Sequence, residues 1–362
     1  MRPGISDNKI RVIVVDDSPL MLRMIASGLT RDGDIEVVAC AKNPYEAREL
    51  IKHHSPDLVT LDVEMPGMNG IEFLEKIMAL RPMPVIMVST LTVIGADVTL
   101  NALHIGAVDA VAKPSGREGL NIFGEELRQK ARAASRATVN RWRPSNTAAC
   151  SSQPSYAADI APLASGCKLI AIGASTGGVG AIYDLVSNLP NHVPPIVITQ
   201  HMPAHFTGRF ASRLNSQLNF DVAEAADGEA LKAGQVRIAP GNAHLSVTRS
   251  GGKLRTTLDP ASGPISGHTP SVDVLFNSVC TSVGADAVGI ILTGMGRDGA
   301  AGLRAMRNTG SMTYGQSEAS CTVYGMPRIA MNLNAVVREL DIHKIPVHLW
   351  EYLNAPPTKK RA

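Results

Sequence analysis

Ser175 is the residue of this 362-residue chain whose setting most favours nucleophilic chemistry. It lies in the run GASTGG at 173–178, after an apolar stretch at 169–172 that predicts a strand and before a segment that predicts a helix. A Gly-x-Ser-x-Gly turn between a strand and a helix is typical of nucleophilic serines, because the small flanking residues permit a tight turn and let a substrate carbonyl approach. The motif therefore favours acyl transfer through Ser175.

A glycine-rich turn between a strand and a helix can instead bind phosphate, as it does in dinucleotide sites. The spacing here argues against a dinucleotide, because Ser175 occupies the place of the middle glycine in that motif. No acidic residue stands about 20 positions further on, where a ribose partner belongs. We therefore prefer the hydrolytic interpretation.

A serine nucleophile needs a base, and two histidines lie near the next predicted strand. His201 directly follows that strand (196–200) and should therefore lie at the same edge of a parallel sheet as Ser175. His205 is the weaker alternative, four residues further on. Asp298, which again stands between a predicted strand and a predicted helix, could orient the imidazole. The order Ser, His, Asp differs from that of the α/β-hydrolases.

A second set of chemically coherent residues follows four strands predicted in the first third of the chain. Asp16 and Asp17 follow the first strand, Asp62 the third, Ser89 the fourth and Lys113 the fifth. Ligand sites of open α/β sheets lie at these strand ends. Clustered carboxylates suit Mg²⁺, which prefers hard oxygen ligands, and the ion together with Lys113 would neutralise an incoming phosphoryl group. The pattern predicts a phosphoryl-accepting pocket.

Two alternating segments must position these residues. Over 9–130, five predicted strands alternate with five predicted helices, which indicates an α/β domain of (βα)5 type with a doubly wound parallel sheet. The alternation resumes at Lys168 and predicts a Rossmann-like α/β domain with a mostly parallel sheet. Turns between short strands at about 220–258 predict an antiparallel insertion. The helices expected nearest the sites are 21–29, 71–80, 123–136, 181–189, 204–214, 272–283 and 299–308.

The segment between the two domains is rich in Ala, Ser, Pro and Asn and predicts an interdomain linker. The predicted division is 9–130, linker 131–165, 166–350 and a polar tail at 351–362. A basic arm surrounds the start of the linker, and it could be either a solvated helix end or a docking arm. Its members are Arg128, Lys130, Arg132, Arg136, Arg141 and Arg143.

Composition excludes several classes of protein. The formal charge of +3 is too small to indicate a nucleic-acid partner. No apolar run approaches the roughly 18 residues of a membrane span, and the polar start has no signal-peptide character, so we expect a cytoplasmic protein without direct membrane insertion. The five cysteines are odd in number and lack CxxC spacing, which predicts free thiols in a reducing compartment and no zinc site.

The pattern VVDDS…LDVEMPGMNG…VST…KP over residues 9–130 resembles response-regulator receiver domains. Family members often carry an aromatic residue on the fifth strand, where this chain has Ala110 or Val111. The resemblance implies a role for each polar residue of the pocket. It makes Asp62 the phosphoacceptor, Asp16, Asp17 and Asp62 the Mg²⁺ ligands with the carbonyl of Glu64, Ser89 the switch hydroxyl, and Lys113 the phosphate contact.

Residues 166–350 resemble the catalytic domain of the chemotaxis protein-glutamate methylesterases, the CheB family. The matching stretches are IGASTGG, ITQHMP, FTGRFASRLN, APGNAHLSV, PSVDVLFNS, LTGMGRDGAAGL and YGMPR. The resemblance implies that Ser175 is the nucleophile, His201 the general base and Asp298 the orienting acid, with the backbone N–H of Met295 as an oxyanion donor. We add the hypothesis that Thr176 forms a hydrogen bond near His201.

The resemblance implies a serine hydrolase that demethylates γ-glutamyl methyl esters on methyl-accepting chemotaxis receptors, deamidates specific glutamines, and needs no cofactor for the ester reaction. Phosphate would come from the chemotaxis histidine kinase, and the unphosphorylated receiver would cover the Ser175 cleft. Two other functions are alternatives. One is a receiver-controlled docking or adaptor protein without catalysis. The other is a DNA-binding response regulator, which the size and charge of the C-terminal domain argue against.

Overall fold

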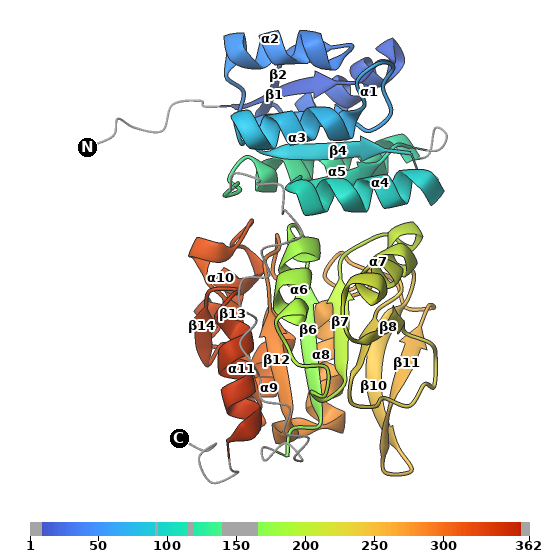
Figure 1. Ribbon diagram of the computed structural model, residues 1–362, viewed down its shortest axis with the longest axis vertical. Helices are drawn as coiled ribbons and strands as arrows, with labels where there is room; N and C mark the ends of the chain where they lie inside the picture. Colours follow the sequence, from blue (N-terminus) through green and yellow to red (C-terminus); the bar gives the residue numbers. More distant parts are fainter. Residues whose placement is uncertain (1–8, 91–92, 115–118, 140–165, 356–362) are drawn as a thin grey trace, which may run out of the picture. The chain divides into compact units, whose positions relative to one another are not determined.

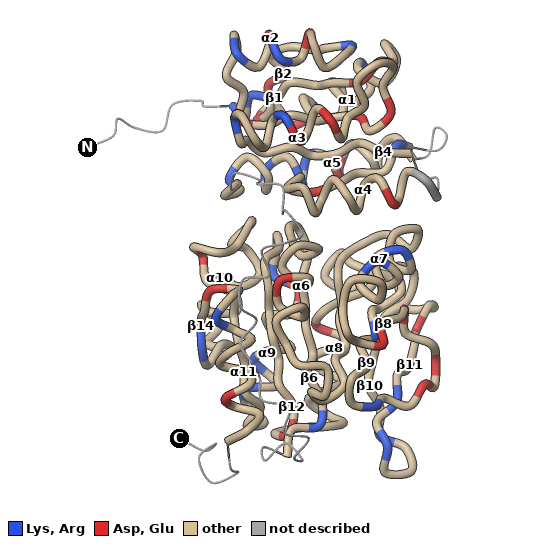
Figure 2. The backbone as a smooth tube through the Cα atoms, viewed as in Figure 1, with Lys and Arg blue, Asp and Glu red and all other residues tan. Residues whose placement is uncertain are grey.

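The computed structural model describes residues 9–90, 93–114, 119–139 and 166–355 (Figure 1). The chain divides into two compact units, and the division falls between Pro144 and Ser145, inside the predicted linker. Residues 140–165 lie outside the described residues, as do Arg141 and Arg143 of the basic arm. Figure 2 shows Lys and Arg interspersed with Asp and Glu along both units.

The first unit is built on a five-stranded sheet in the order β2-β1-β3-β4-β5, with every neighbouring pair parallel. This confirms the predicted doubly wound parallel sheet. The strands are β1 (Ile10–Val15), β2 (Ile35–Ala41), β3 (Leu58–Asp62), β4 (Val85–Ser89) and β5 (Asp109–Ala112). The helices are α1 (Pro19–Thr30), α2 (Pro44–His54), α3 (Gly70–Leu80), α4 (Val93–Ile105) and α5 (Gly119–Ala134).

Alternate residues of the central strands face two separate cores. Val12 and Val14 of β1 pack with α1 and α5, whereas Ile13 and Val15 pack with α2, α3 and α4. Both sets are fully or almost fully buried. This is why the strands are continuously apolar, since a parallel sheet covered by helices on both faces exposes neither face to water.

Helices of the first unit start at capping residues close behind the strands. Ser18, Asn43 and Asn69 each accept a hydrogen bond from the backbone N–H three residues later, and proline begins α1 and α2. Such caps satisfy N–H groups that have no partner within the helix, and the fixed φ of proline suits the first turn. The caps of α1 and α3 thereby fix the loops that follow β1 and β3, next to Asp16 and to Asp62, the last residue of β3.

Helix α5 differs from its predicted bounds of 123–136, because it starts at Gly119 and ends at Ala134. It also runs past the predicted domain boundary at 130. Three members of the basic arm are bound within the first unit. Arg128 and Arg132 pair with Asp32 at 3.0 and 2.6 Å, and Lys130 pairs with Asp109 at 3.0 Å. Arg128 is 6% exposed, so the solvated helix end predicted for it is wrong, and a docking role for the rest of the arm stays a prediction.

The second unit is built on a seven-stranded sheet in the order β14-β13-β12-β6-β7-β9-β8, in which every neighbouring pair is parallel. A separate antiparallel hairpin joins β10 to β11. The strands are β6 (Leu169–Ala174), β7 (Ile196–Gln200), β8 (Asp221–Glu224), β9 (Gln235–Ile238), β10 (His244–Ser250), β11 (Lys253–Asp259), β12 (Ala287–Ile291), β13 (Met312–Gln316) and β14 (Arg338–Leu340).

The predicted α/β fold with a short antiparallel insertion is confirmed, but the insertion is smaller than expected. Among the strands of the described residues, β10 and β11 form the one antiparallel pair, whereas β8 and β9 extend the main sheet in parallel. The helices of this unit are α6 (Gly178–Ser187), α7 (Ala204–Gln217), α8 (Val272–Ser282), α9 (Ala300–Asn308), α10 (Met326–Asn332) and α11 (Ile345–Asn354). Helices α8 and α9 share one buried core, to which Phe276 and Leu303 contribute.

Helix α11 shows that the prediction of a polar tail from residue 351 is wrong at its start. The helix continues to Asn354, and Ile345, Leu349 and Leu353 are all fully buried. These residues are spaced four apart, so they lie on one face of the helix and anchor it to the core. Residues 356–362 lie outside the described residues.

Two expectations from composition can be compared with the structure. Cys40, Cys167, Cys280 and Cys321 are free thiols, as predicted, and Cys150 lies outside the described residues. Among the described residues, no helix has the length and apolar character needed to cross a bilayer.

Candidate functional site

Ser175 and His201 leave adjacent strands at the same point. Strands β6 and β7 lie side by side (Figure 1). Ala174, the last residue of β6, pairs with Gln200, the last residue of β7, so Ser175 and His201 directly follow the two paired strand ends. The N–H of His201 donates to the carbonyl of Ala174 at 3.1 Å. The side-chain amide of Gln200 donates to the carbonyls of Ser175 and His201, at 2.9 and 3.1 Å. These hydrogen bonds hold the backbones of Ser175 and His201 next to each other.

The turn after Ser175 requires glycine. Gly177 has φ of +77°, a left-handed conformation that side chains disfavour, and the N–H of Gly178 donates to the carbonyl of Ser175 at 2.7 Å. A Cβ at Gly178 would collide with the amide of Gln200. Helix α6 therefore starts immediately behind a tight turn that leaves Ser175 partly exposed, as the motif predicts.

Asp298 is held by four hydrogen-bond donors. Nε2 of His201 lies 2.8 Å from Oδ2, which also accepts from the N–H of Val272 at 2.7 Å. The hydroxyl of Ser271 and the N–H of Asp273 donate to Oδ1 at 2.8 and 3.1 Å. Burial alone would raise the pKa of Asp298, but the bonds from His201 and the start of α8 outweigh it and hold the pKa at about 2. The carboxylate is therefore ionised at neutral pH.

The contact with Asp298 decides which nitrogen of His201 can act as a base. An ionised carboxylate can only accept a hydrogen bond, so Nε2 of His201 must carry the proton that it donates. Nδ1 of the neutral ring then has a lone pair that can accept a proton. Nδ1 is buried and has no hydrogen-bond partner among the described residues. In enzymes without bound substrate, the bond from a serine to its base often forms only when substrate arrives. Nδ1 is thus the nitrogen available to Ser175.

The loop after β12 lies directly against Ser175. The N–H of Ser175 donates to the carbonyl of Thr293 at 3.0 Å, and a Cβ added at Gly294 would lie 2.7 Å from the Cβ of Ser175. The carbonyl of Gly294 accepts from the N–H of Met326 at 2.8 Å, which fixes the loop from its far side. Met295 follows, and no hydrogen bond to its N–H is found among the described residues. This leaves a free donor next to Ser175.

Thr176 is 5% exposed, and its carbonyl accepts from the hydroxyl of Thr293 at 3.0 Å. This bond joins the Ser175 turn to the loop that carries Met295. A role for the Thr176 side chain near His201 stays a prediction.

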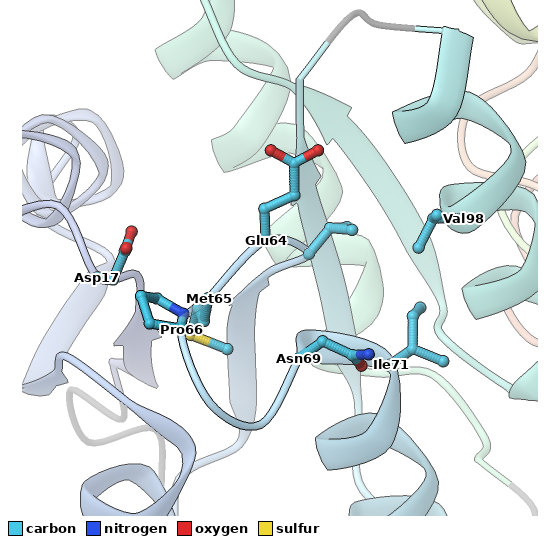
Figure 3. Close-up of a pocket in the computed structure, with 8 residues that line it drawn as sticks. Asp17, Glu64, Met65, Pro66, Asn69, Ile71 and Val98 are labelled. Atoms are coloured by element: carbon cyan, nitrogen blue, oxygen red, sulfur yellow. The ribbon is translucent and has the colours of Figure 1, made fainter.

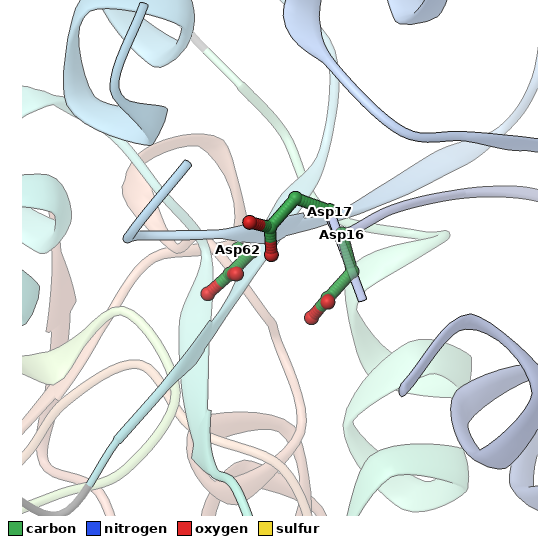
Figure 4. Close-up of side chains that lie close together, drawn as sticks. All are labelled: Asp16, Asp17 and Asp62. Atoms are coloured by element: carbon green, nitrogen blue, oxygen red, sulfur yellow. The ribbon is translucent and has the colours of Figure 1, made fainter. Parts of the chain in front are cut away.

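The acidic residues of the first unit converge as predicted. Carboxylate oxygens of Asp16, Asp17 and Asp62 lie within 4.8 Å of one another (Figure 4). Nζ of Lys113 lies 2.9 Å from Oδ2 of Asp16 and 2.8 Å from Oδ2 of Asp62. The N–H of Glu64 reaches Oδ1 of Asp62 at 3.4 Å. Asp16 and Asp62 lie at the ends of the neighbouring strands β1 and β3, and Lys113 reaches both of them from the end of β5, on the other side of β4.

The electrostatics of this cluster indicate a deficit of positive charge. Burial and the negative charge of Asp16 raise the pKa of Asp62, although Lys113 opposes them. Burial would lower the pKa of Lys113, but its bonds to Asp62 and Asp16 raise it. The Oδ2 atoms of both aspartates are buried, and their contact to Lys113 lacks good hydrogen-bond geometry. A divalent cation fits this set of hard oxygen donors.

The remaining predicted receiver residues lie around the cluster. Ser89 ends β4 and is 1% exposed, and its hydroxyl donates to the carbonyls of Thr90 and Gly95 at 3.3 and 3.4 Å. The hydroxyl is thus bonded to backbone carbonyls instead of to the Asp62 carboxylate. On β5, Val111 is buried and Ala110 is partly exposed. Neither residue supplies the aromatic ring that family members often carry at this place.

A pocket of about 460 Å³ adjoins the acidic cluster and shares Asp17 with it. Figure 3 shows Asp17 at one side, Glu64 above, and Ile71 with Val98 at the other side. The wall is thus acidic toward the cluster and apolar toward α3 and α4.

Comparisons with known proteins agree with both halves of this description. The family model described as CheB methylesterase matches residues 170–349, and the response regulator receiver domain matches residues 12–122. A protein-glutamate methylesterase/protein-glutamine glutaminase of Caulobacter vibrioides is 55% identical over 348 residues, which cover 96% of this chain and 99% of that protein. This chain belongs to the CheB family.

Other CheB proteins extend the agreement. A protein-glutamate methylesterase/protein-glutamine glutaminase of Escherichia coli K12 is 47% identical over 351 residues, which cover 96% of this chain and 98% of that protein. The crystal structure of the Thermotoga maritima CheB methylesterase catalytic domain aligns with a TM-score of 0.50 at 36% identity. It covers 51% of this chain and 98% of that domain. Membership of CheB makes the chain a hydrolase with a receiver domain and disfavours the adaptor and DNA-binding alternatives.

Sequence reasoning missed two residues that hold the site of this CheB protein. Ser271 precedes an apolar periodic segment, which is a capping signal, and it does cap α8. Nothing in the local pattern indicates that its hydroxyl also reaches Asp298, 27 residues away. His268 was missed as well, and its ring stacks on that of His201.

Proposed function

We propose that this chain is a protein-glutamate methylesterase and glutamine deamidase of methyl-accepting chemotaxis receptors, with Asp62 as the activating phosphorylation site. The observation that carries the proposal is the 2.8 Å contact between Nε2 of His201 and Asp298, next to a serine on the adjacent strand end. The names of the CheB relatives supply the substrate class. The substrate residues would lie on the cytoplasmic helices of the receptors.

The proposed hydrolysis begins with attack of Ser175 Oγ on the ester carbonyl. Nδ1 of His201 takes the serine proton, and the ionised Asp298 stabilises the resulting imidazolium through Nε2. General-base assistance of this kind contributes roughly 10²–10⁴-fold in rate. Because the low pKa of Asp298 keeps it charged, it acts as an electrostatic partner and takes up no proton itself.

The tetrahedral oxyanion that results is proposed to accept a hydrogen bond from the N–H of Met295, and one such donor contributes roughly 10²–10³-fold. His201 then gives its proton to the leaving group, which departs as methanol from an ester or as ammonia from an amide. Water attacks the acyl-enzyme with His201 again as base. Glutamate is released and Ser175 regains its proton, so no cofactor is needed.

In the receiver, we propose that a carboxylate oxygen of Asp62 attacks the phosphoryl group of a phosphohistidine on the chemotaxis histidine kinase. The new P–O bond forms as the P–N bond breaks, and the imidazole of the kinase leaves. Asp16, Asp17 and Asp62 with the carbonyl of Glu64 would hold Mg²⁺, which would offset negative charge on the phosphoryl group. Lys113 would move its ion pair from the carboxylates to the phosphate. Ser89 would exchange its backbone bonds for one to the phosphate. The charge deficit of the cluster supports this proposal.

The test measures methanol release from methylated receptor membranes, with and without a small-molecule phosphodonor and Mg²⁺. We expect Ser175→Ala to abolish release and Asp62→Ala to remove only the stimulation by the donor. Ser187→Ala, on the helix behind the motif, is the matched control and should behave as wild type. Wild-type release from Ser175→Ala would refute the hydrolase mechanism, and undiminished stimulation of Asp62→Ala would refute the regulatory site.

A further inference from the structure

The ring of His268 lies flat against the ring of His201. Their centroids are 3.7 Å apart and the planes differ by 12°. The hydrogen bond to Asp298 fixes only the Nε2 edge of His201, so the ring could still turn about the axis through that bond. A flat contact on the ring face removes this freedom. The direction in which Nδ1 points therefore depends on His268.

A tight turn places His268 at this position. Ile265 and His268 exchange two backbone hydrogen bonds, each of 3.0 Å. The two residues between them, Ser266 and Gly267, both have positive φ, of 54° and 84°. This is the pattern of a type I′ turn, a well-defined two-residue connection. The backbone at His268 is therefore held in place by a turn with little conformational freedom.

A buried histidine clamps the segment at both ends. Nε2 of His244 lies 3.1 Å from the carbonyl of Gly263, and Nδ1 of His244 accepts from the N–H of Ser271 at 3.1 Å. His244 is 1% exposed and begins β10. We call residues 263–271 the strap. One end of the strap also contacts the site directly, because the hydroxyl of Ser271 donates to Asp298.

We propose that the strap positions the catalytic base of this protein, with His268 as a positioning residue that holds the ring plane of His201 by stacking. The inference rests on the proposed function, since it takes His201 as the base. His268 acts through His201 and has no part in bond making. The strap therefore supports both of the residues behind Ser175, with His268 against the base and Ser271 against the acid.

The experiment measures how fast a fluorophosphonate probe labels Ser175 in the full chain. This rate depends on the base but not on any receptor. We compare wild type with His268→Phe, which keeps a ring, and with His268→Gln and His268→Ala, which do not. Since a displacement of about 1 Å costs about 10²-fold in rate, we expect the last two to label about 10- to 100-fold more slowly. The labelling rate of His268→Phe should stay within about threefold of the wild-type rate, which is the size of effect expected from a mild substitution.

His205→Ala is the matched control. The contact with Asp298 belongs to His201 and not to the alternative His205, which is exposed on α7, so this substitution should change the rate by no more than about twofold. Methanol release gives a second readout, in which His268→Gln should lower kcat and leave KM unchanged.

Wild-type labelling by His268→Gln, or slow labelling by His268→Phe in a chain that unfolds at the wild-type temperature, would overturn the proposal. An increase of KM alone would also overturn it, because that result would make His268 a substrate contact. Normal labelling of wild type without methanol release would instead refute the proposed substrate and leave the strap inference standing.

Discussion

At the scale of the residue, the serine site depends on the absence of side chains as much as on their presence. Gly294 separates Thr293 from Met295 and leaves room for Ser175, whose Cβ would lie 2.7 Å from a Cβ at position 294. Asp298 represents the opposite case, in which one carboxylate satisfies four donors. A carboxylate that is bonded in this way is both ionised and immobile, which is the state that an orienting acid requires.

Gly294→Ala is the substitution that tests this crowding. The added methyl would force Ser175 or the Met295 loop to shift, so we expect kcat for methanol release to fall by about 10²-fold. Overpacking should also lower the free energy of unfolding of this unit by about 1–3 kcal/mol. Gly180→Ala is the control, because nothing lies within 4 Å of the added Cβ on α6. The control substitution should raise the free energy of unfolding by roughly 0.5–1 kcal/mol, because alanine is favoured over glycine in a helix. A wild-type kcat for Gly294→Ala would contradict the crowding argument.

At the scale of the element, each site is built where parallel strands end and helices begin. β6 and β7 supply Ser175 and His201, and the start of α8 supplies N–H donors to Asp298. The positive end of a helix favours a carboxylate at that place. In the receiver, Asp16 and Lys113 likewise follow β1 and β5, and Asp62 is the last residue of β3. Elements that close the core, such as α11, carry no site residue but hold the sheet.

Leu353→Ala tests whether α11 is part of the folded domain. Leu353 is fully buried, so its truncation should lower the free energy of unfolding by about 2–5 kcal/mol, measured by thermal or denaturant unfolding. Glu351→Ala is the control on the same helix. It removes only an exposed pair with His348 at 3.4 Å, and such surface pairs contribute about 0–1 kcal/mol. Equal effects of the two substitutions would show that α11 does not pack as described.

At the scale of the whole molecule, the acidic cluster and the serine site belong to different compact units, each with its own core. We expect the two units to unfold in separable transitions, since multidomain chains rarely unfold as one. Any change in the charge of the acidic cluster should then act on one transition only.

The charge balance of Asp62 provides the test. Its pKa is raised by burial and by Asp16, so the folded receiver binds this proton more tightly than the unfolded chain does. Stability from this group is therefore lost as pH rises through the raised pKa. In the metal-free chain at pH 7, Asp62→Asn should raise the unfolding temperature of the receiver, and its advantage over wild type should shrink as pH falls.

Calorimetry with and without Mg²⁺ measures this effect. Binding of the ion to the folded state should raise the receiver transition of wild type, and raise that of Asp62→Asn much less. Asp17→Asn is the matched control for burial, because Asp17 is the exposed member of the cluster and its removal should change the metal-free transition little. The transition of the serine-site unit should stay constant throughout. A wild-type receiver that does not respond to Mg²⁺ would contradict the proposed metal site.

The sequence alone determined the features that depend on short stretches of chain. The turn around Ser175 needs its glycines locally, the continuously apolar strands indicate burial on both faces, and residues directly behind parallel strands share one edge of the sheet. These three rules were enough to bring Asp16, Asp62 and Lys113 into one cluster and to place His201 next to Ser175. The free cysteines and the α/β class followed from composition and alternation in the same way.

Tertiary structure decided the contacts between distant segments. His201 and Asp298 are 97 residues apart and meet because β12 lies beside β6 in the sheet, an order that no local pattern specifies. The strap is held next to His201 by the clamp at His244 and by the bond from Ser271 to Asp298. The bounds of α5 and α11 depend on what each helix packs against. Such contacts form only when loops close and the core packs. The free energy that stabilises them therefore comes from the packing of the whole unit, and no short stretch of sequence predicts it.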